Sequence, residues 1–227
     1  MKKKLFFHLN LDFSSIEESE RLTVIKNSYV PLFELRHSYE IYFEATISTL
    51  RSIQELEPSF FGRVSHYFKL NQRQFIGSGF YQIIHDCYSD DIFERNVEKA
   101  KNEYNQLLGF VPEIWLANEM VFSRRLLRLY AKYGIAKLLV DKRSLPSVYH
   151  FYSELMIDDL DLTLVFADSL NWQLLQDVTS GSQKTEFLTL KRSFKSHEFI
   201  YSGDAEHFGV NLERFDHEIP QFRADRV

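Results

Sequence analysis

The stretch from Glu113 to Ser123 constrains the fold of this chain more than any other. Pro112 ends the segment before it, because proline fits neither a helix interior nor a central strand. Residues 114–117 form a short apolar run, which is typical of a strand buried on both faces. Glu119 follows, and a helical pattern begins at Met120. The carboxylate therefore lies at the edge where α/β folds collect ligands and catalytic groups. It equally fits a residue that complements a helix dipole.

Apolar runs and amphipathic patterns alternate along the rest of the chain. We expect strands at residues 5–11, 40–45, 74–79, 135–140, 162–166 and 198–202 in addition to 114–117. We expect helices at residues 23–36, 46–57, 59–70, 89–108, 123–133, 168–176 and 181–192, and an extended excursion at 149–155. This alternation predicts an α/β fold with a parallel sheet and right-handed crossovers, either open or closed as a barrel.

Charge and cysteine content exclude several classes of protein. The net charge of −5 provides no basic field for nucleic acid. Cys87 is the one cysteine, so an intramolecular disulfide and a multi-cysteine zinc site are excluded. The apolar start of the chain is interrupted by His8, Asn10 and Asp12, too early for a signal peptide. We therefore expect a cytoplasmic protein with neither a membrane nor a nucleic-acid partner.

Two carboxylates occupy equivalent places in the predicted fold. Asp204 follows the strand at 198–202, as Glu119 follows the strand at 114–117. Glycoside hydrolysis needs such a pair, one acting as acid and the other as nucleophile or base. Aromatic residues make up 15% of the chain, and flat rings of this kind line sugar-binding clefts. With 32 acidic residues in the chain, however, such a pair also arises by chance.

Four short motifs follow one another in a recognisable order. The first strand ends with His8, Asn10 and Asp12, whose alternation places them on one face. Residues 77–81 read Gly-Ser-Gly-Phe-Tyr, and residues 115–119 read Trp-Leu-Ala-Asn-Glu. Residues 204–209 read Asp-Ala-Glu-His-Phe-Gly. In this order the motifs resemble those of glycoside hydrolase family 57, which comprises α-amylases, 4-α-glucanotransferases and branching enzymes.

The match to the family is partial at two motifs. His8 stands at the first histidine of the family's His-x-His-Gln-Pro, while Asn10 replaces the second. Gln82 stands where Glu or His is usual after the glycine motif. The family also continues into a C-terminal helical region, which we expect to be absent here. We expect residues 1–227 to form a single catalytic domain.

The resemblance implies a fold, an activity and a set of site residues. The fold is a seven-stranded parallel (β/α)7 barrel, complete or distorted, and the activity is retaining hydrolysis or transfer on an α-glucan or maltooligosaccharide. Glu119 is then the nucleophile and Asp204 the acid/base, with carboxyl groups roughly 5–5.5 Å apart, against 6.5–9.5 Å in an inverting enzyme. The implied substrate-binding residues are His8, Asn10, Gly79, Tyr81 and Trp115. A tryptophan inside a strand fits the core equally well.

Two alternatives stay open at this point. One is a glucan-binding relative that keeps the barrel without catalysis. The other is a metal-dependent polysaccharide deacetylase on a similar barrel, which needs His and Asp ligands at close spacing. His8 and Asp12 are the early candidates for such ligands, and no His-x-x-x-His occurs in the sequence. Our main interpretation requires no metal and no cofactor, and leaves the oligomeric state open.

Overall fold

The computed structural model describes residues 4–12, 16–37, 40–120, 122–168 and 199–205. Its strands are β1 (Lys4–Leu9), β2 (Glu40–Ala45), β3 (Phe75–Gly77), β4 (Ile114–Leu116), β5 (Lys137–Asp141), β6 (Glu154–Ile157), β7 (Leu162–Asp168) and β8 (Phe199–Asp204). Its α-helices are α1 (Arg21–Val24), α2 (Val30–Glu34), α3 (Ile47–Leu56), α4 (Pro58–Leu70), α5 (Asp90–Leu108) and α6 (Arg124–Lys132). Of the helix expected at 168–176 only Asp168 is described, and it is the last residue of β7. The helix expected at 181–192, and residues 206–209 of the fourth motif, lie outside the described residues.

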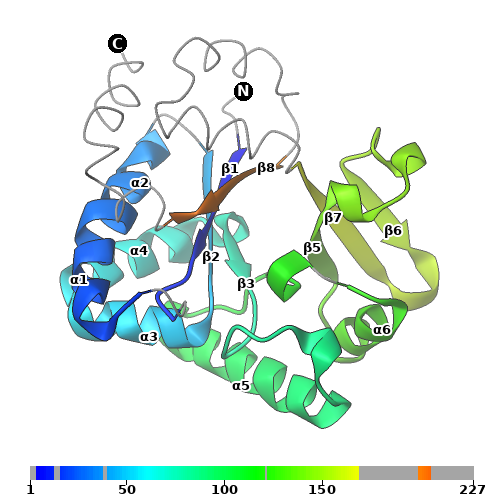
Figure 1. The fold of residues 1–227 in the computed structure, drawn as a ribbon, viewed down its shortest axis with the longest axis horizontal. Coiled ribbons are helices and arrows are strands. Elements are labelled where there is room, and N and C mark those ends of the chain that lie inside the picture. Colours follow the sequence, from blue (N-terminus) through cyan, green and yellow to red (C-terminus); the bar gives the residue numbers. More distant parts are fainter. Residues whose placement is uncertain (1–3, 13–15, 38–39, 121, 169–198, 206–227) are drawn as a thin grey trace.

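Seven of these strands are parallel and follow one another around a barrel (Figure 1). The pairings run from β1 through β2, β3, β4, β5, β7 and β8 and return to β1. The seam between β7 and β8 is short, with two residue pairs, Ala167↔Phe199 and Asp168↔Ile200. The prediction of an α/β fold with a (β/α)7 barrel is confirmed, in a form that is distorted at this seam.

Strand β6 is an addition that the sequence did not reveal as a strand. It runs antiparallel to β7 and pairs along Leu162–Val165, the part of that edge that β8 leaves uncovered. Its side chains are exposed and half-buried in alternation, without an apolar run. The expected excursion at 149–155 overlaps it, but its pairing depends on β7 and leaves no local pattern.

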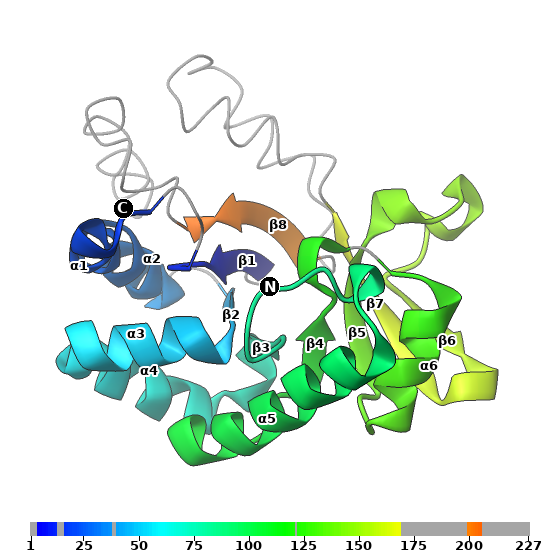
Figure 2. The same cartoon turned by 60° about the horizontal axis from the view of Figure 1, so that its bottom comes forward.

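The parallel strands divide their side chains between two apolar clusters. The inner cluster holds Phe6, Tyr42, Ile76, Ile114, Leu116, Leu139, Val165 and Ala167, all of them from strands. The outer cluster contains the residues between these positions, such as Phe7, Phe43 and Trp115, together with the apolar faces of the helices. Because strand side chains alternate, one set fills the barrel and the other packs against the helices. Figure 2 shows α3, α4 and α5 along one side of the strands.

The helices follow their sequence signals with one exception. Helix α5 begins after Ser89 and ends at Gly109, whose φ of 80° is the left-handed geometry that favours glycine. The single helix expected at 23–36 is instead interrupted by a π-helical turn, Ile25–Tyr29. Pro31 lies just beyond that turn and has no N–H to donate, so the regular α ladder cannot continue through it. No helix among the described residues is long and apolar enough to cross a membrane.

His85 links two of the outer helices. It is 2% exposed and lies between Asn96 of α5 and Tyr130 of α6. The side-chain nitrogen of Asn96 lies 2.8 Å from Nε2, and the Tyr130 hydroxyl lies 3.1 Å from Nδ1. An amide donor at Nε2 leaves that nitrogen without a hydrogen, which is the neutral form of the ring. Burial lowers the pKa of His85 to about 4.

We predict that His85 makes stability depend on pH. The unfolded chain takes up a proton near pH 6.5, whereas the folded chain resists it down to about pH 4, so stability falls as the pH falls through this window. The difference corresponds to about 3 kcal/mol. Urea unfolding at pH 7 and pH 4 should therefore show a smaller acid loss in His85→Gln, which keeps an amide donor and acceptor. Equal losses in both proteins would contradict this.

Candidate active site

Buried polar side chains gather at one end of the barrel. In a parallel barrel all strands end at the same edge, so residues that follow different strands come together there. Most of the buried polar residues lie at these ends: His8, Asn10, Glu44, Thr46, Ser78, Asn118, Asp141 and Lys142. Burying polar groups is costly without partners, so their concentration at one end marks it as the candidate site.

Both predicted catalytic carboxylates belong to this end. Asp204 is the last residue of β8 and is half-buried. Glu119 follows β4 by three residues and is exposed. Asp204 pairs in register with His8 of the neighbouring strand β1. The strand ends therefore bring the first, third and fourth sequence motifs to one edge of the barrel.

His8 lies at the centre of this arrangement. It is 6% exposed, and its Nδ1 contacts Oε2 of Glu44, its register partner on β2. Burial lowers the pKa of His8, while the negative charges of Asp204 and Glu119 and a hydrogen bond with Gln82 act in the opposite direction. His8 is thus within electrostatic range of both carboxylates, although its net tendency is to stay neutral.

Glu119 has a strained backbone. Its φ of 58° and ψ of 14° lie in the left-handed region, and Met120 has a φ of 53°. Two successive residues with a Cβ in this region cost roughly 1–3 kcal/mol each. The side chain of Glu119 accepts a hydrogen bond from Nε2 of Gln82 at 3.2 Å. Strain of this kind is concentrated at functional sites, which supports a special role for this turn.

Two of the predicted substrate-binding residues lie at or near the site end. Asn10 is 4% exposed, and its backbone N–H donates to the Tyr29 hydroxyl at 3.1 Å. Tyr81 is 58% exposed, and its backbone N–H donates to the side chain of Asn96 at 2.9 Å. The ring of Tyr81 is therefore accessible from solvent, as a sugar-stacking ring must be.

Trp115 does not have the place that was predicted for it. The side chain is 1% exposed, packs in the outer apolar cluster and donates from Nε1 to the Pro112 carbonyl oxygen at 2.9 Å. It alternates with Ile114 and Leu116, which face the barrel interior. Trp115 therefore points toward the helices, and the prediction that its ring lines the cleft is wrong. The alternative of a core tryptophan is correct.

Gly79 is surrounded by protein atoms. A Cβ at this position would lie 2.0 Å from Nδ2 of Asn96 and 2.7 Å from the carbonyl oxygen of Tyr81. The nearest atom to this position therefore belongs to a side chain of α5. This packing explains the glycine by itself, and a contact with substrate at Gly79 stays a prediction.

Three further residues of this end were missed as site residues. Glu44 has no motif around it, and only the strand register reveals that it faces His8. Gln82 departs from the family pattern in the sequence, but the sequence does not show its contact with Glu119. Asn118 is 2% exposed and donates from Nδ2 to the Ile83 carbonyl oxygen at 2.9 Å, and none of the residues that the structure describes hydrogen-bonds its Oδ1. Asn118 lies in the 3-10 turn that follows β4, so no strand pattern in the sequence indicates its burial.

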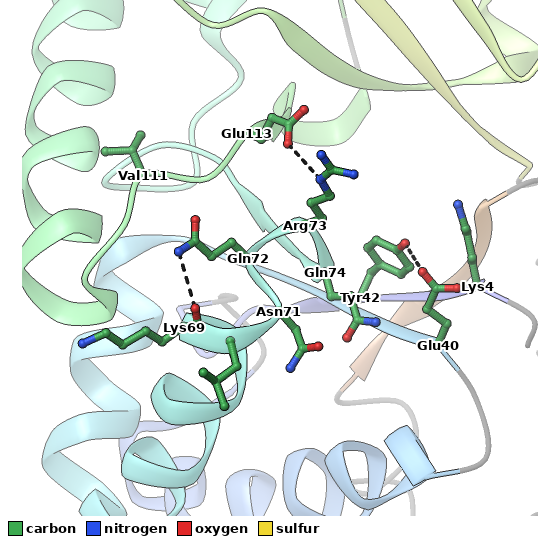
Figure 3. A pocket seen from close by; sticks show the side chains of 11 residues that line it. Lys4, Glu40, Tyr42, Lys69, Asn71, Gln72, Arg73, Gln74, Val111 and Glu113 are labelled. Carbon is green, nitrogen blue, oxygen red and sulfur yellow. Dashed lines mark hydrogen bonds and ion pairs between the residues drawn. The ribbon is translucent and has the colours of Figure 1, made fainter.

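The described residues also bear on other kinds of site. Within the described ranges, no group of three or more His, Cys, Asp or Glu side chains is arranged to hold a metal ion. A pocket of about 730 Å³ opens at the opposite, amino-terminal end of the strands (Figure 3). Tyr42 donates to Glu40 there at 2.5 Å, and Arg73 lies 3.7 Å from Glu113. This pocket is separate from the carboxylates of the candidate site.

Comparisons with known proteins agree with this architecture. A family model described as "Glycosyl hydrolase family 57" matches residues 7–176. A 4-alpha-glucanotransferase from Thermococcus litoralis is similar in structure, with a TM-score of 0.73 and 17% identity over 99% of this chain. An exo-type maltose-forming amylase from Pyrococcus sp. ST04 has a TM-score of 0.67 and 10% identity over 98% of the chain. A search of curated protein sequences finds no match.

The similarity covers only part of these two relatives and extends to the fold alone. The chain spans 37% of the length of the glucanotransferase and 45% of that of the amylase. The Bc1960 peptidoglycan N-acetylglucosamine deacetylase shares the fold as well, with a TM-score of 0.50 and 12% identity over 98% of this chain and 82% of that one. At such identities the structures show a common fold, and they assign no activity.

We predict that Gly79 stabilises the folded protein. The Gly79→Ala substitution should lower the free energy of unfolding by roughly 1–3 kcal/mol, because the new methyl group overlaps Asn96. Gly62→Ala is the matched control: Gly62 is exposed within α4 and has open space around a Cβ, so alanine should stabilise by about 0.5–1 kcal/mol. Chemical denaturation measures both, and a neutral Gly79→Ala would contradict the packing.

We also predict that the left-handed backbone conformation of Glu119 lowers the free energy of unfolding. Glu119→Gly should raise the free energy of unfolding by about 1 kcal/mol relative to Glu119→Ala, because both remove the carboxylate but only glycine relieves the left-handed strain. Denaturant unfolding of the two variants measures this difference. If Glu119→Ala and Glu119→Gly have equal free energies of unfolding, the left-handed geometry of this turn is wrong.

Proposed function

The chain belongs to glycosyl hydrolase family 57, and on this basis we propose that it is a retaining glycosidase or transglycosylase that acts on α-glucans. The observation that carries the proposal is the common neighbourhood of Glu119, Asp204 and His8 at the carboxyl end of the barrel. A retaining enzyme needs two carboxylates that face one anomeric carbon from different strands. Two carboxylates that both act electrostatically on one buried histidine support such a pair.

The roles follow from the chemistry of double displacement. Glu119 attacks the anomeric carbon as a carboxylate and forms a glycosyl-enzyme bond. Asp204 gives its proton to the oxygen of the leaving sugar, and then takes a proton from the water or sugar hydroxyl that releases the product. Asp204 is the more enclosed of the two, which suits the proton donor. Glu119 is exposed, so an incoming sugar can reach it.

The substrate class is inferred from the neighbours and from the site. The structural neighbours are named as a 4-alpha-glucanotransferase and a maltose-forming amylase, which both act on α-linked glucose chains. The exposed ring of Tyr81 offers an apolar plane for a pyranose, while His8 and Asn10 supply hydrogen-bonding groups. We infer an α-glucan or a maltooligosaccharide as the substrate.

One observation favours a second candidate function, glucan binding without turnover. The buried position after β4 is occupied by Asn118, whose amide cannot act as a nucleophile. Glu119, the carboxylate beside it, is exposed and has a left-handed backbone conformation. In a binding protein the amide of Asn118 would hydrogen-bond a sugar hydroxyl, and no glycosyl-enzyme would form. Release of glucose or maltose from maltoheptaose separates the two functions.

We predict different kinetic signatures for the two carboxylates. Glu119→Gln should lower kcat by at least about a thousandfold and leave maltooligosaccharide binding largely intact, because the amide keeps the shape but cannot attack. Asp204→Asn should slow maltooligosaccharides by about a hundredfold or more, yet spare aryl glycosides, whose leaving group needs no protonation. Rates on both substrates and calorimetric binding constants measure these effects.

The matched control is Glu113→Gln, because Glu113 lies at the opposite end of β4 and pairs with Lys137 and Arg73. Its rates should stay unchanged. Equal losses on both substrate types in Asp204→Asn would exclude Asp204 as the acid. Binding without turnover in the unsubstituted protein would exclude the enzyme and favour the second candidate.

A further inference from the structure

Glu44 is a third carboxylate of the candidate site. It lies near the end of β2, is fully buried at 0% exposure, and directs Oε2 at Nδ1 of His8. Its other oxygen, Oε1, is buried and has no hydrogen-bond partner among the described residues. The register of β1 against β2 places the two residues opposite each other, so their contact is built into the sheet.

Packing alone does not account for a carboxylate here. Taking an ionised group out of water costs several kcal/mol, and one contact with a histidine offsets only part of that. The neighbouring inward positions of the barrel hold Phe6, Tyr42 and Ile76, so an apolar side chain would fit at position 44. A buried group that is expensive and only partly satisfied is better explained by its effect on its partner.

Gln82 links His8 to Glu119, the proposed nucleophile. Gln82 lies close enough to the side chain of His8 to raise the pKa of the ring, and it donates from Nε2 to Oε1 of Glu119 at 3.2 Å. An ionised carboxylate only accepts hydrogen bonds, so Gln82 must present its amide nitrogen to Glu119. Since Nδ1 faces the carboxylate of Glu44, the single N–H of a neutral His8 is on Nδ1, and Nε2 is an acceptor. The amide nitrogen of Gln82 carries a second N–H, which is the group that can serve Nε2 of His8.

We propose that Glu44 is a positioning residue that acts through His8 and Gln82 to hold Glu119 at the reaction centre. Glu44 fixes the orientation of the imidazole, the imidazole fixes the amide of Gln82, and the amide holds one oxygen of Glu119 in a turn that is otherwise strained. This inference rests on the proposed function, in which Glu119 is the nucleophile. The charged groups around His8 are Glu44 from β2, Asp204 from β8 and Glu119 after β4.

The contact can be tested without any enzymatic assay. Proton and nitrogen NMR follow the titration of His8, assigned with His8→Gln. Glu44→Gln removes a negative charge that touches the ring, so the pKa of His8 should fall by about 1 or more. Glu40→Gln is the matched control, because Glu40 is on the same strand but at its opposite end, and should leave that pKa unchanged. An unchanged pKa in Glu44→Gln would overturn the proposal, whether or not the protein is active.

The effect on Glu119 is tested by kinetics on a maltooligosaccharide. Glu44→Gln and Gln82→Ala should each lower kcat by about 10- to 100-fold, because a misplaced nucleophile reacts slowly. KM should change little in Glu44→Gln, since the buried carboxylate cannot touch the substrate. Gln82 is half-buried, so Gln82→Ala tests the relay even if Glu44→Gln unfolds. Full activity in folded Gln82→Ala would overturn the relay. If the unsubstituted protein lacks turnover while the pKa of His8 still falls in Glu44→Gln, the proposed function fails and the contact stands.

Discussion

The two-residue alternation of the barrel strands determines which side chains reach the site. On β1 and β2 it turns Phe6, His8, Tyr42 and Glu44 inward and sends Phe7 and Phe43 to the helices. Since all seven strands of the barrel run in the same direction, the inward positions near their ends form a single polar group. The parallel pairing of β1 with β8 places His8 and Asp204 opposite each other, although they are far apart in the sequence.

The same rule separates what the sequence predicts from what it does not. Apolar runs located the seven strands of the barrel, and the residues after them located Glu119 and Asp204. A strand of three residues such as β4 is too short for its sequence to show which side chains face the barrel interior. The sequence therefore placed Trp115 in the cleft, although it faces the helices. The partnership of His8 with Glu44 depends on register, which no local pattern of either strand contains. The left-handed turn at Glu119 likewise arises from tertiary constraints.

The candidate site combines several costs that a purely structural barrel end would avoid. Glu44 is a buried carboxylate with one oxygen that has no hydrogen-bond partner in the described part of the chain, and Glu119 has unfavourable backbone angles. Burial lowers the pKa of His8, although three carboxylates, Glu44, Glu119 and Asp204, lie around its ring. Folds tolerate such features where they serve chemistry or binding, and compensate for them in the core. Here the compensation comes from a large aromatic outer cluster, including Phe33, Phe43 and Phe68, whose rings pack tilted against one another.

The central claim is that Glu119 forms a covalent bond with the sugar. A 5-fluoro-α-glucosyl fluoride, or its maltosyl homologue, slows the second step of a retaining enzyme and lets the intermediate accumulate. Mass spectrometry of the labelled protein then measures the adduct, and fragmentation of the peptide that spans β4 locates it. The account predicts one glycosyl group per chain, on Glu119 and absent in Glu119→Gln. Label on another carboxylate, or hydrolysis of a maltooligosaccharide with no trapped adduct, would contradict it.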